Sequence, residues 1–236
     1  MSANPSPSLW VLIPAAGRAS RMGLATPKPF LELNGKLIIE YSIELFHRDP
    51  RVKQIVIMAE PSELLDRLCQ KYSKLTIISG GAERKDSVMN GVSYVLQQDD
   101  TAWVAVHDAA RPCLHFDDWQ HLVERSFNRS VSAILASPVV DTIKQVDGSH
   151  VIKTVDRATL VRALTPQVTS AKTLYQALIN ADGLQQVVTD EGQALELIGE
   201  SLEYVLAKHD NLKVTYPSDL QLVEQVLQLR ESGNGK

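Results

Sequence analysis

Residues 11–30, VLIPAAGRASRMGLATPKPF, contain the strongest indication of the fold. An apolar run typical of a buried strand ends in the small-residue turn PAAG, and the cations Arg18, Arg21 and Lys28 follow closely. Backbone N–H groups of such a turn can approach an anion, and neighbouring cations neutralise its charge. A tight strand-to-helix connection with surface cations is the alternative, and a glycine-containing turn alone does not decide between the two.

The same alternation of strand and helix recurs along the chain. Apolar runs such as QIVIMAE and WVAVHDA are each followed by a stretch of helical period. This alternation predicts an α/β fold, with a Rossmann-like, mostly parallel sheet and helices on both faces. Ligands of such sheets bind beyond the carboxyl ends of the strands, so the candidate site lies among residues 15–28, 80–87 and 107–111.

The rhythm breaks at residues 140–156, VDTIKQVDGSHVIKTVD, where two alternating segments flank an Asp-Gly pair. This pattern predicts a hairpin, and we expect an extended β-arm at about 139–157. A two-stranded ribbon is marginal in water, so the arm is expected to pack against a second copy of the chain in a homodimer.

No repeat or linker interrupts the rest of the sequence, so residues 1–236 are predicted to form a single domain. Periodicity predicts strands at 204–209 and 212–216. It also predicts helices near 172–181, 191–198 and 218–230.

The composition points to a small-molecule partner. The formal net charge is −4 and the basic residues are scattered, which argues against nucleic acid or an acidic membrane as partner. No stretch resembles a signal peptide or a membrane span, so a cytoplasmic location is expected. Cys69 and Cys113 lie far apart and no Cys/His cluster has ligand spacing, so neither a disulfide nor a zinc site is predicted.

The turn after the first strand differs from a dinucleotide-binding turn. Ala19 stands where the second glycine of that motif belongs, and the next strand ends at Glu60, too far along for the acidic residue of the motif. A nicotinamide dehydrogenase is therefore disfavoured. Lys28 lies between Pro27 and Pro29, whose rings restrict the backbone and hold the cation on a stiff stem. A fixed lysine opposite a small-residue turn suits a triphosphate.

Nine motifs follow one another along residues 11–219: PAAGRASRMG, PKPF, GGAERKDSV, VHDAARP, DTIK, TVDR, LTPQ, TDEGQALE and DNLKVT. In this order they resemble the 2-C-methyl-D-erythritol 4-phosphate cytidylyltransferase family. The resemblance implies a nucleotidyltransferase fold and attack of the methylerythritol phosphate on the α-phosphorus of CTP, with release of pyrophosphate. It also implies a Mg²⁺ cofactor held mainly by the CTP phosphates, with Asp108 as a candidate ligand.

The resemblance further implies a role for individual residues. Four cations would stabilise the reacting phosphates: Arg21, Lys28, Arg157 and Lys213. Nucleotide binding would fall to small or hydroxyl residues: Ala15, Ala16, Gly17, Gly81, Ala82, Ser87 and Ala109. The methylerythritol phosphate would contact Asp108, Arg111, Thr142, Thr165 and Thr189. Of these residues, Thr142 and Arg157 belong to the arm and would reach the site of the partner subunit.

Several residues keep a structural alternative. Ser87 could cap a helix, Asp108 could cap a turn, and Arg18 could be solvated. Ala82 stands where one familiar form of the family has Asp, which puts cytosine selectivity in doubt if that contact uses a carboxylate. His107 is expected to be structural.

Structural roles are also possible for the candidate residues in the second half of the chain. Arg157 and Lys213 could be exposed surface charges, while Asp190 and Glu191 are expected to cap a helix and Asp210 to support the site indirectly. A sister enzyme acting on ribitol 5-phosphate is the nearest alternative function. A catalytically silent nucleotide-binding domain is another, although such a domain is expected to lack the cations.

Overall fold

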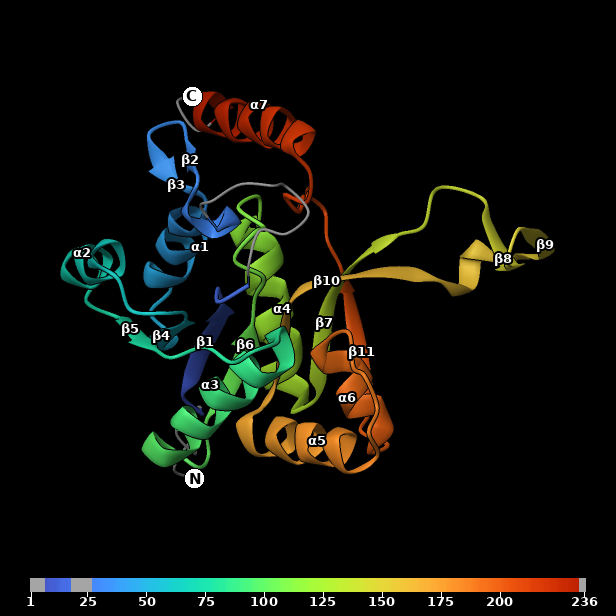
Figure 1. Ribbon diagram of the computed structural model, residues 1–236, viewed down its shortest axis with the longest axis horizontal. Coiled ribbons are helices and arrows are strands. Elements are labelled where there is room, and N and C mark those ends of the chain that lie inside the picture. The colour runs from blue at the N-terminus through green and yellow to red at the C-terminus, as the bar shows by residue number, and fades with distance from the viewer. Residues whose placement is uncertain (1–6, 18–26, 234–236) are drawn as a thin grey trace.

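The computed structural model describes residues 7–17 and 27–233 and places them in an α/β fold (Figure 1). The predicted cations Arg18 and Arg21 therefore lie outside the described residues. Seven strands form the central sheet, and from one edge to the other they are β11 (Leu202–Leu206), β7 (Ser132–Pro138), β10 (Val161–Ser170), β6 (Trp103–Val106), β1 (Leu9–Pro14), β4 (Val52–Met58) and β5 (Leu75–Ile78).

The sheet is mostly parallel, as predicted from the sequence. The pairs β1 with β4, β1 with β6, β4 with β5 and β11 with β7 are parallel. Strand β10 runs antiparallel to both of its neighbours, β6 and β7. The carboxyl ends of β1, β4, β5 and β6 consequently meet at one edge of the sheet.

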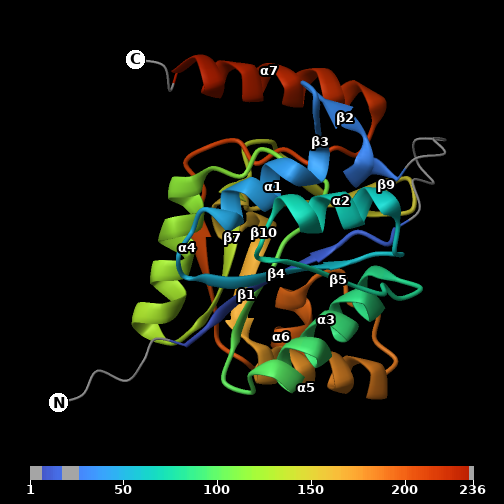
Figure 2. The ribbon, with the colours of Figure 1, turned by 90° about the vertical axis from the view of Figure 1, so that its left-hand side faces the viewer.

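Helices cover both faces of the sheet (Figure 2). On one face α1 (Ile38–His47), α2 (Glu63–Lys71) and α4 (Phe116–Arg129) share a hydrophobic core with Leu9, Val11 and Ile13 of β1. On the other face α3 (Arg84–Gln98), α5 (Ala171–Gly183) and α6 (Glu191–Leu197) pack with Trp10 and Leu12. The period-two alternation along β1 thus directs successive side chains into opposite cores.

A third, smaller core lies beyond the edge of the sheet. Helix α7 (Pro217–Gly233) packs on the short hairpin of β2 (Glu32–Leu33) and β3 (Lys36–Leu37), and Val223 and Leu227 of the helix are buried against Leu33. Leu31, three residues after Lys28, packs against this core. Among the described residues, no helix combines the length and the apolar character needed to cross a membrane.

The predicted β-arm is a hairpin that projects from the body of the molecule (Figure 1). Strand β8 (Ile143–Asp147) pairs with β9 (His150–Val155) in antiparallel fashion and forms a sheet of its own. Gly148 has a φ of +53°, the left-handed conformation that glycine adopts without steric cost, so the Asp-Gly pair marks the turn correctly.

In the second half of the chain one predicted strand is absent, one strand was not predicted and one is shifted. Residues 212–216 do not form a strand: they run without a sheet neighbour, and Val214 N–H donates instead to the carbonyl of Ala110 at 2.8 Å. Strand β10 was not predicted, because Pro166 interrupts its pattern. In the structure Pro166 falls where the register between β10 and β7 shifts, between Ala163 and Gln167. The strand predicted at 204–209 lies at Leu202–Leu206.

Candidate active site

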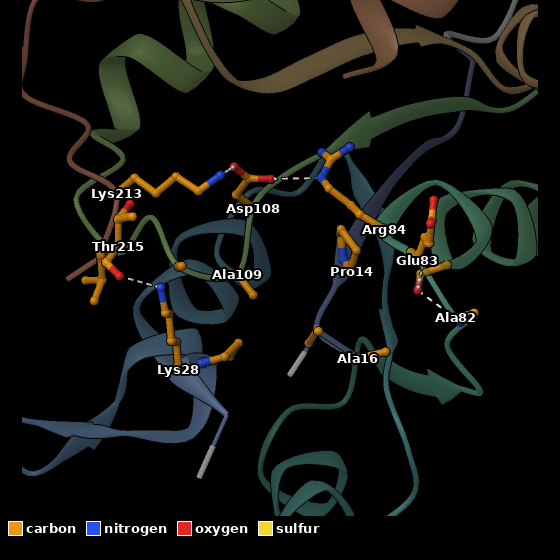
Figure 3. Close-up of a pocket in the computed structure, with 17 residues that line it drawn as sticks. Pro14, Ala16, Lys28, Ala82, Glu83, Arg84, Asp108, Ala109, Lys213 and Thr215 are labelled. Carbon is orange, nitrogen blue, oxygen red and sulfur yellow. Dashed lines mark hydrogen bonds and ion pairs between the residues drawn. The ribbon is translucent and has the colours of Figure 1, made fainter. Parts of the chain in front are cut away.

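A cavity of about 290 Å³ opens at the carboxyl ends of β1, β5 and β6. Its walls come from chain segments far apart in sequence (Figure 3). Ten of the residues selected from the sequence line it: Ala15, Ala16, Gly17, Lys28, Gly81, Ala82, Ser87, Asp108, Ala109 and Lys213. The edge of the sheet that the strand–helix pattern indicated is therefore where these residues meet.

The loops that follow β1 and β5 touch each other through small residues. Ala15 N–H donates to the carbonyl of Met58 at 2.9 Å, which fixes the first loop to the end of β4. A Cβ atom added at Gly80 would lie only 2.3 Å from the Cβ of Ala16, so this position requires glycine for the close approach. The contact makes one continuous wall of small side chains.

The loop that leads into α3 is held by its own hydrogen bonds. Glu83 N–H donates to the Asp86 carboxylate at 3.0 Å, which caps the helix. The Ser87 hydroxyl accepts from Gly81 N–H at 2.9 Å and faces the carbonyl of Glu83 at 3.1 Å as a donor. Ser87 is buried in the cavity wall, and its contact with a nucleotide base stays a prediction.

Lys28 begins the short 3₁₀ helix Lys28–Phe30 and extends into the cavity (Figure 3). Pro27 is extended, with φ of −60° and ψ of 141°, and Pro29 is buried, so the stem of the lysine is fixed from both sides. The ammonium group donates to the carbonyl of Thr215 at 2.5 Å. This bond joins the PKPF segment to the segment that carries Lys213.

Asp108, at the end of β6, is the centre of a cluster of charges. Its Oδ1 accepts from Arg84 Nε at 3.1 Å, and its Oδ2 lies 2.7 Å from Lys213 Nζ and 3.4 Å from Arg111 Nε. Arg84 also forks onto the carboxylate of Glu191, with contacts of 2.6 and 3.1 Å. Five charged side chains from four separate parts of the chain thus support one another.

Burial by itself disfavours the charged form of Asp108, but the positive charges of Arg84, Lys213 and Arg111 hold its pKa well below the ordinary value. Burial would likewise lower the pKa of Arg84, whereas Glu191 and Asp108 raise it. Both groups therefore stay ionised at neutral pH. The cluster is a fixed array of charges rather than a proton donor or acceptor.

Sequence reasoning missed Arg84, although the residue belongs to the quoted GGAERKDSV motif. Arg84 follows a strand and begins a helix, and this position at the carboxyl end of a parallel strand could have identified it as a candidate site residue. Its two carboxylate partners lie 24 and 107 positions further along the chain, so no local pattern shows the pairing.

Five of the residues selected from the sequence lie elsewhere. Thr165 is buried, and its hydroxyl accepts from the backbone N–H of Asp108 at 3.0 Å. The same hydroxyl lies 3.2 Å from His107 Nδ1. On the other side of the ring, His107 Nε2 donates to the Arg111 carbonyl at 3.2 Å. Arg111 lines a second cavity that adjoins the first through Lys213.

The other three lie on exposed segments. The Thr189 hydroxyl donates to Gln193 Oε1 at 3.1 Å, just before α6. Thr142 and Arg157 lie at the base of the arm, and Arg157 donates to the carbonyl of Val140. The substrate contacts of these three residues, like that of Arg21 outside the described residues, stay predictions.

Together the fold and the cavity define a nucleotidyltransferase-type α/β protein, with a small-residue wall on one side of the pocket and lysines on the other (Figure 3). A family model described as 2-C-methyl-D-erythritol 4-phosphate cytidylyltransferase (IspD) matches residues 9–229. The chain belongs to this family, and the prediction that it is a nucleotidyltransferase enzyme is confirmed.

Individual relatives agree with the family model. The cytidylyltransferase of that name from Aliivibrio fischeri (strain MJ11) is 40% identical over 224 residues, 94% of each chain. The one from Haemophilus ducreyi is 42% identical over 218 residues, 90% of this chain and 93% of that protein. The crystal structure of the Francisella tularensis enzyme matches with a TM-score of 0.80 at 31% identity, covering 93% of this chain and 99% of that one.

Proposed function

We propose that the cavity at the ends of β1, β5 and β6 joins CTP to 2-C-methyl-D-erythritol 4-phosphate, giving 4-diphosphocytidyl-2-C-methyl-D-erythritol and pyrophosphate for isoprenoid precursor synthesis. The family to which the chain belongs is named for this reaction. The observation that supports the location is that Lys28 and Lys213 reach one cavity whose opposite wall consists of small residues. Backbone amides of that wall can approach phosphate closely, and the lysines neutralise it.

The chemistry needs charge stabilisation more than proton transfer. A phosphate monoester is already an anion near neutral pH, so it attacks the α-phosphorus of CTP without a general base. Negative charge then grows on the α-phosphate and on the departing pyrophosphate. Lys28, whose stem is fixed between prolines, and the predicted Arg21 would stabilise that charge. Lys213, with the predicted Arg157 of a second subunit, would hold the attacking phosphate in line.

Mg²⁺ fits this pocket as an ion held chiefly by nucleotide phosphates. Carboxylate oxygens are ligands that Mg²⁺ prefers, and Asp108 offers the buried carboxylate nearest the lysines. Both of its oxygens already contact cations, at 3.1 Å from Arg84 and 2.7 Å from Lys213. Asp108 would therefore share its oxygens between these cations and the metal. When bound, the ion would neutralise charge of the triphosphate.

We also propose that the arm makes a homodimer. Four of its apolar side chains, Val140, Val146, Val151 and Ile152, are each more than half exposed. A ribbon of two strands needs a packing partner in water, and a second copy of the chain would bury these residues. The same contact would bring Thr142 and Arg157 to the pocket of the partner subunit. The cytoplasmic location stays a prediction.

Pyrophosphate release tests the reaction. Wild-type chain with CTP and Mg²⁺ is offered 2-C-methyl-D-erythritol 4-phosphate or ribitol 5-phosphate, and release is expected with the first acceptor. Lys28→Ala is expected to lower kcat by a factor of about 10² to 10³, the usual effect of removing one preorganised charge donor. Lys172→Ala, an exposed lysine on α5, is the matched control. If pyrophosphate were released with ribitol 5-phosphate alone, that compound would be the acceptor substrate. A kcat of Lys28→Ala equal to that of wild type would contradict the proposed role of Lys28.

Subunit mixing tests the shared site. Lys28→Ala and Arg157→Ala are each expected to be inactive as homodimers. In a mixed dimer one pocket would carry both substitutions and the other would carry none. Random mixing makes half of the dimers mixed, so about a quarter of wild-type activity is expected to return. No recovery, in a mixture shown to exchange subunits, would mean that Arg157 acts within its own chain.

A further inference from the structure

Residues 213–215 line the catalytic cavity, although no strand in the described part of the chain pairs with them. Both lysines of the cavity depend on this segment. Lys213 belongs to it, and its Nζ lies 2.7 Å from Asp108 Oδ2. Lys28 Nζ donates to the carbonyl of Thr215 at 2.5 Å (Figure 3). The path of this segment therefore sets where the two ammonium groups lie.

Asp219 provides the hydrogen bonds that a neighbouring strand would otherwise supply. It lies in the first turn of α7, and its Oδ2 accepts from Thr215 N–H and from Tyr216 N–H, each at 2.7 Å. Asp219 N–H donates in turn to the carbonyl of Tyr216 at 3.0 Å. These three bonds fasten the end of the unpaired segment to the start of the helix.

One of these bonds controls the direction of the carbonyl that holds Lys28. The carbonyl of Thr215 and the N–H of Tyr216 belong to one planar peptide group, and because this group is trans, they point in opposite directions. Asp219 binds the N–H side of the group, and Lys28 binds the carbonyl side. The Asp219 carboxylate thus aims the Thr215 carbonyl at the Lys28 ammonium group.

Asp219 is ionised in this arrangement. Hydrogen bonds from Tyr216 N–H and Thr215 N–H, with a smaller contribution from the positive charge of Lys28, hold the pKa of Asp219 below its ordinary value of 3.8. Both hydrogen bonds are therefore charge-assisted near neutral pH, which makes them stronger than bonds to a neutral acceptor. A charged acceptor also polarises the peptide group and strengthens its carbonyl as an acceptor for Lys28.

We propose that Asp219 is a positioning residue for nucleotidyl transfer, because it places the Lys28 ammonium group through the peptide group of Thr215 and Tyr216. This inference rests on the proposed function, in which Lys28 stabilises charge on the α-phosphate. Asp219 itself is not among the described residues that line the cavity, so it acts through Lys28. A misplacement of about 1 Å can cost about 10² in rate, so a small displacement of the lysine is enough to matter.

Capping of α7 is the structural alternative, because a carboxylate in the first turn satisfies N–H groups at the start of any helix. The two roles differ in what they change. Loss of a cap lowers the stability of the fold and leaves the rate of the folded enzyme as it was. Loss of a positioning residue lowers the rate of molecules that are fully folded.

Pyrophosphate release from CTP, Mg²⁺ and 2-C-methyl-D-erythritol 4-phosphate, measured well below the Tm of each variant, separates these roles. Asp219→Ala is expected to lower kcat by a factor of about 10 to 10². Asp219→Asn should recover most of that loss, because its amide oxygen can accept the same two N–H groups. Ser170→Ala is the matched control. Ser170 caps α5 beside the first residue of β6, at the opposite end of that strand from the cavity, so its loss should lower Tm and leave kcat unchanged.

A double-mutant cycle shows whether Asp219 acts through Lys28. In the Lys28→Ala background, Asp219→Ala should cause no further fall in kcat, since the ammonium group that it positions is gone. Calorimetry of CTP binding with Mg²⁺ and without acceptor gives the same comparison without turnover: Asp219→Ala should weaken binding only where Lys28 is present. This coupling in a wild-type chain that releases no pyrophosphate would overturn the proposed reaction and retain the role of Asp219.

Two results would overturn the role of Asp219. One is a wild-type kcat in Asp219→Ala together with a lowered Tm, which would leave Asp219 as a helix cap. The other is an equal loss from Asp219→Ala with and without Lys28. Asp219→Glu replaces the alanine variant if the circular dichroism of that variant differs from wild type. Glutamate is favoured at this helix position, and its extra methylene displaces the carboxylate oxygens, so kcat should still fall.

Discussion

Replacing Arg84 by methionine removes the charge that holds two buried carboxylates while keeping a long apolar stem. Asp108 retains Lys213 and Arg111 in this variant. Glu191, whose side chain is 2% exposed, loses the one side chain that binds it within the described part of the chain. The variant therefore leaves one buried carboxylate without a positive partner.

The expected cost follows from that exposure. Breaking a buried ion pair from one side costs about 3–5 kcal/mol. The side chain of Arg84 is 32% exposed, so water can partly replace it, and we expect the lower end, about 3 kcal/mol of unfolding free energy. Adding Glu191→Gln removes the stranded charge. The double variant should then lack only hydrogen bonds, worth about 1–1.5 kcal/mol.

Urea unfolding followed by circular dichroism and by tryptophan fluorescence measures these differences, and coincident curves confirm a single transition. Arg67→Met on α2, an exposed arginine, is the matched control and should change stability by less than about 0.5 kcal/mol. The reasoning is refuted if Arg84→Met costs under about 1 kcal/mol, or if the double variant is no more stable than the single one.

Two further predictions concern packing and pH. Gly80→Ala should cost about 1–3 kcal/mol and weaken CTP binding in calorimetry, because the new Cβ would lie 2.3 Å from Ala16; CTP binding as tight as in wild type would contradict the close contact. Burial opposes the charge of Asp49, but hydrogen bonds from Arg51 and Trp119 hold its pKa below the ordinary 3.8. The unfolded state therefore takes up this proton first, and stability that is complete above pH 3.8 should fall as pH drops below it. Asp49→Asn should flatten that decline in acid unfolding followed by tryptophan fluorescence, and an unchanged slope would exclude Asp49 as its source.

The features predicted correctly from the sequence are those that depend on residues close together in the chain. The strand at the start of the chain, the turn after it and the lysine between prolines each depend on neighbouring residues, so their pattern was sufficient. The Asp-Gly turn of the arm is equally local, and Gly148 adopts the expected left-handed φ of +53°. All seven candidates for nucleotide binding line the cavity at the carboxyl ends of the strands, where the strand–helix pattern placed the site.

Contacts between distant segments had no such pattern. Arg84 at the start of α3 pairs with Glu191 at the start of α6, 107 positions further along the chain, and neither segment encodes this contact alone. The alternation of Leu212 and Val214 looked like a strand. Its cause is burial against α7 rather than a sheet neighbour. The same alternation of apolar residues can arise from a sheet neighbour or from packing against a helix. The sequence alone does not show which of these elements will lie beside the segment.

The topology also shows where the arm enters the body. Pro138 at the end of β7 pairs with Val161 at the start of β10, and these strands are antiparallel neighbours. Residues 139–160 are therefore an insertion into the turn of an ordinary hairpin. Replacing residues 139–160 with a short turn would leave every strand of the central sheet beside its present neighbours. The arm is in this sense a detachable module: its removal would take away Thr142, Arg157 and the proposed subunit contact together, and would leave the central sheet as it is.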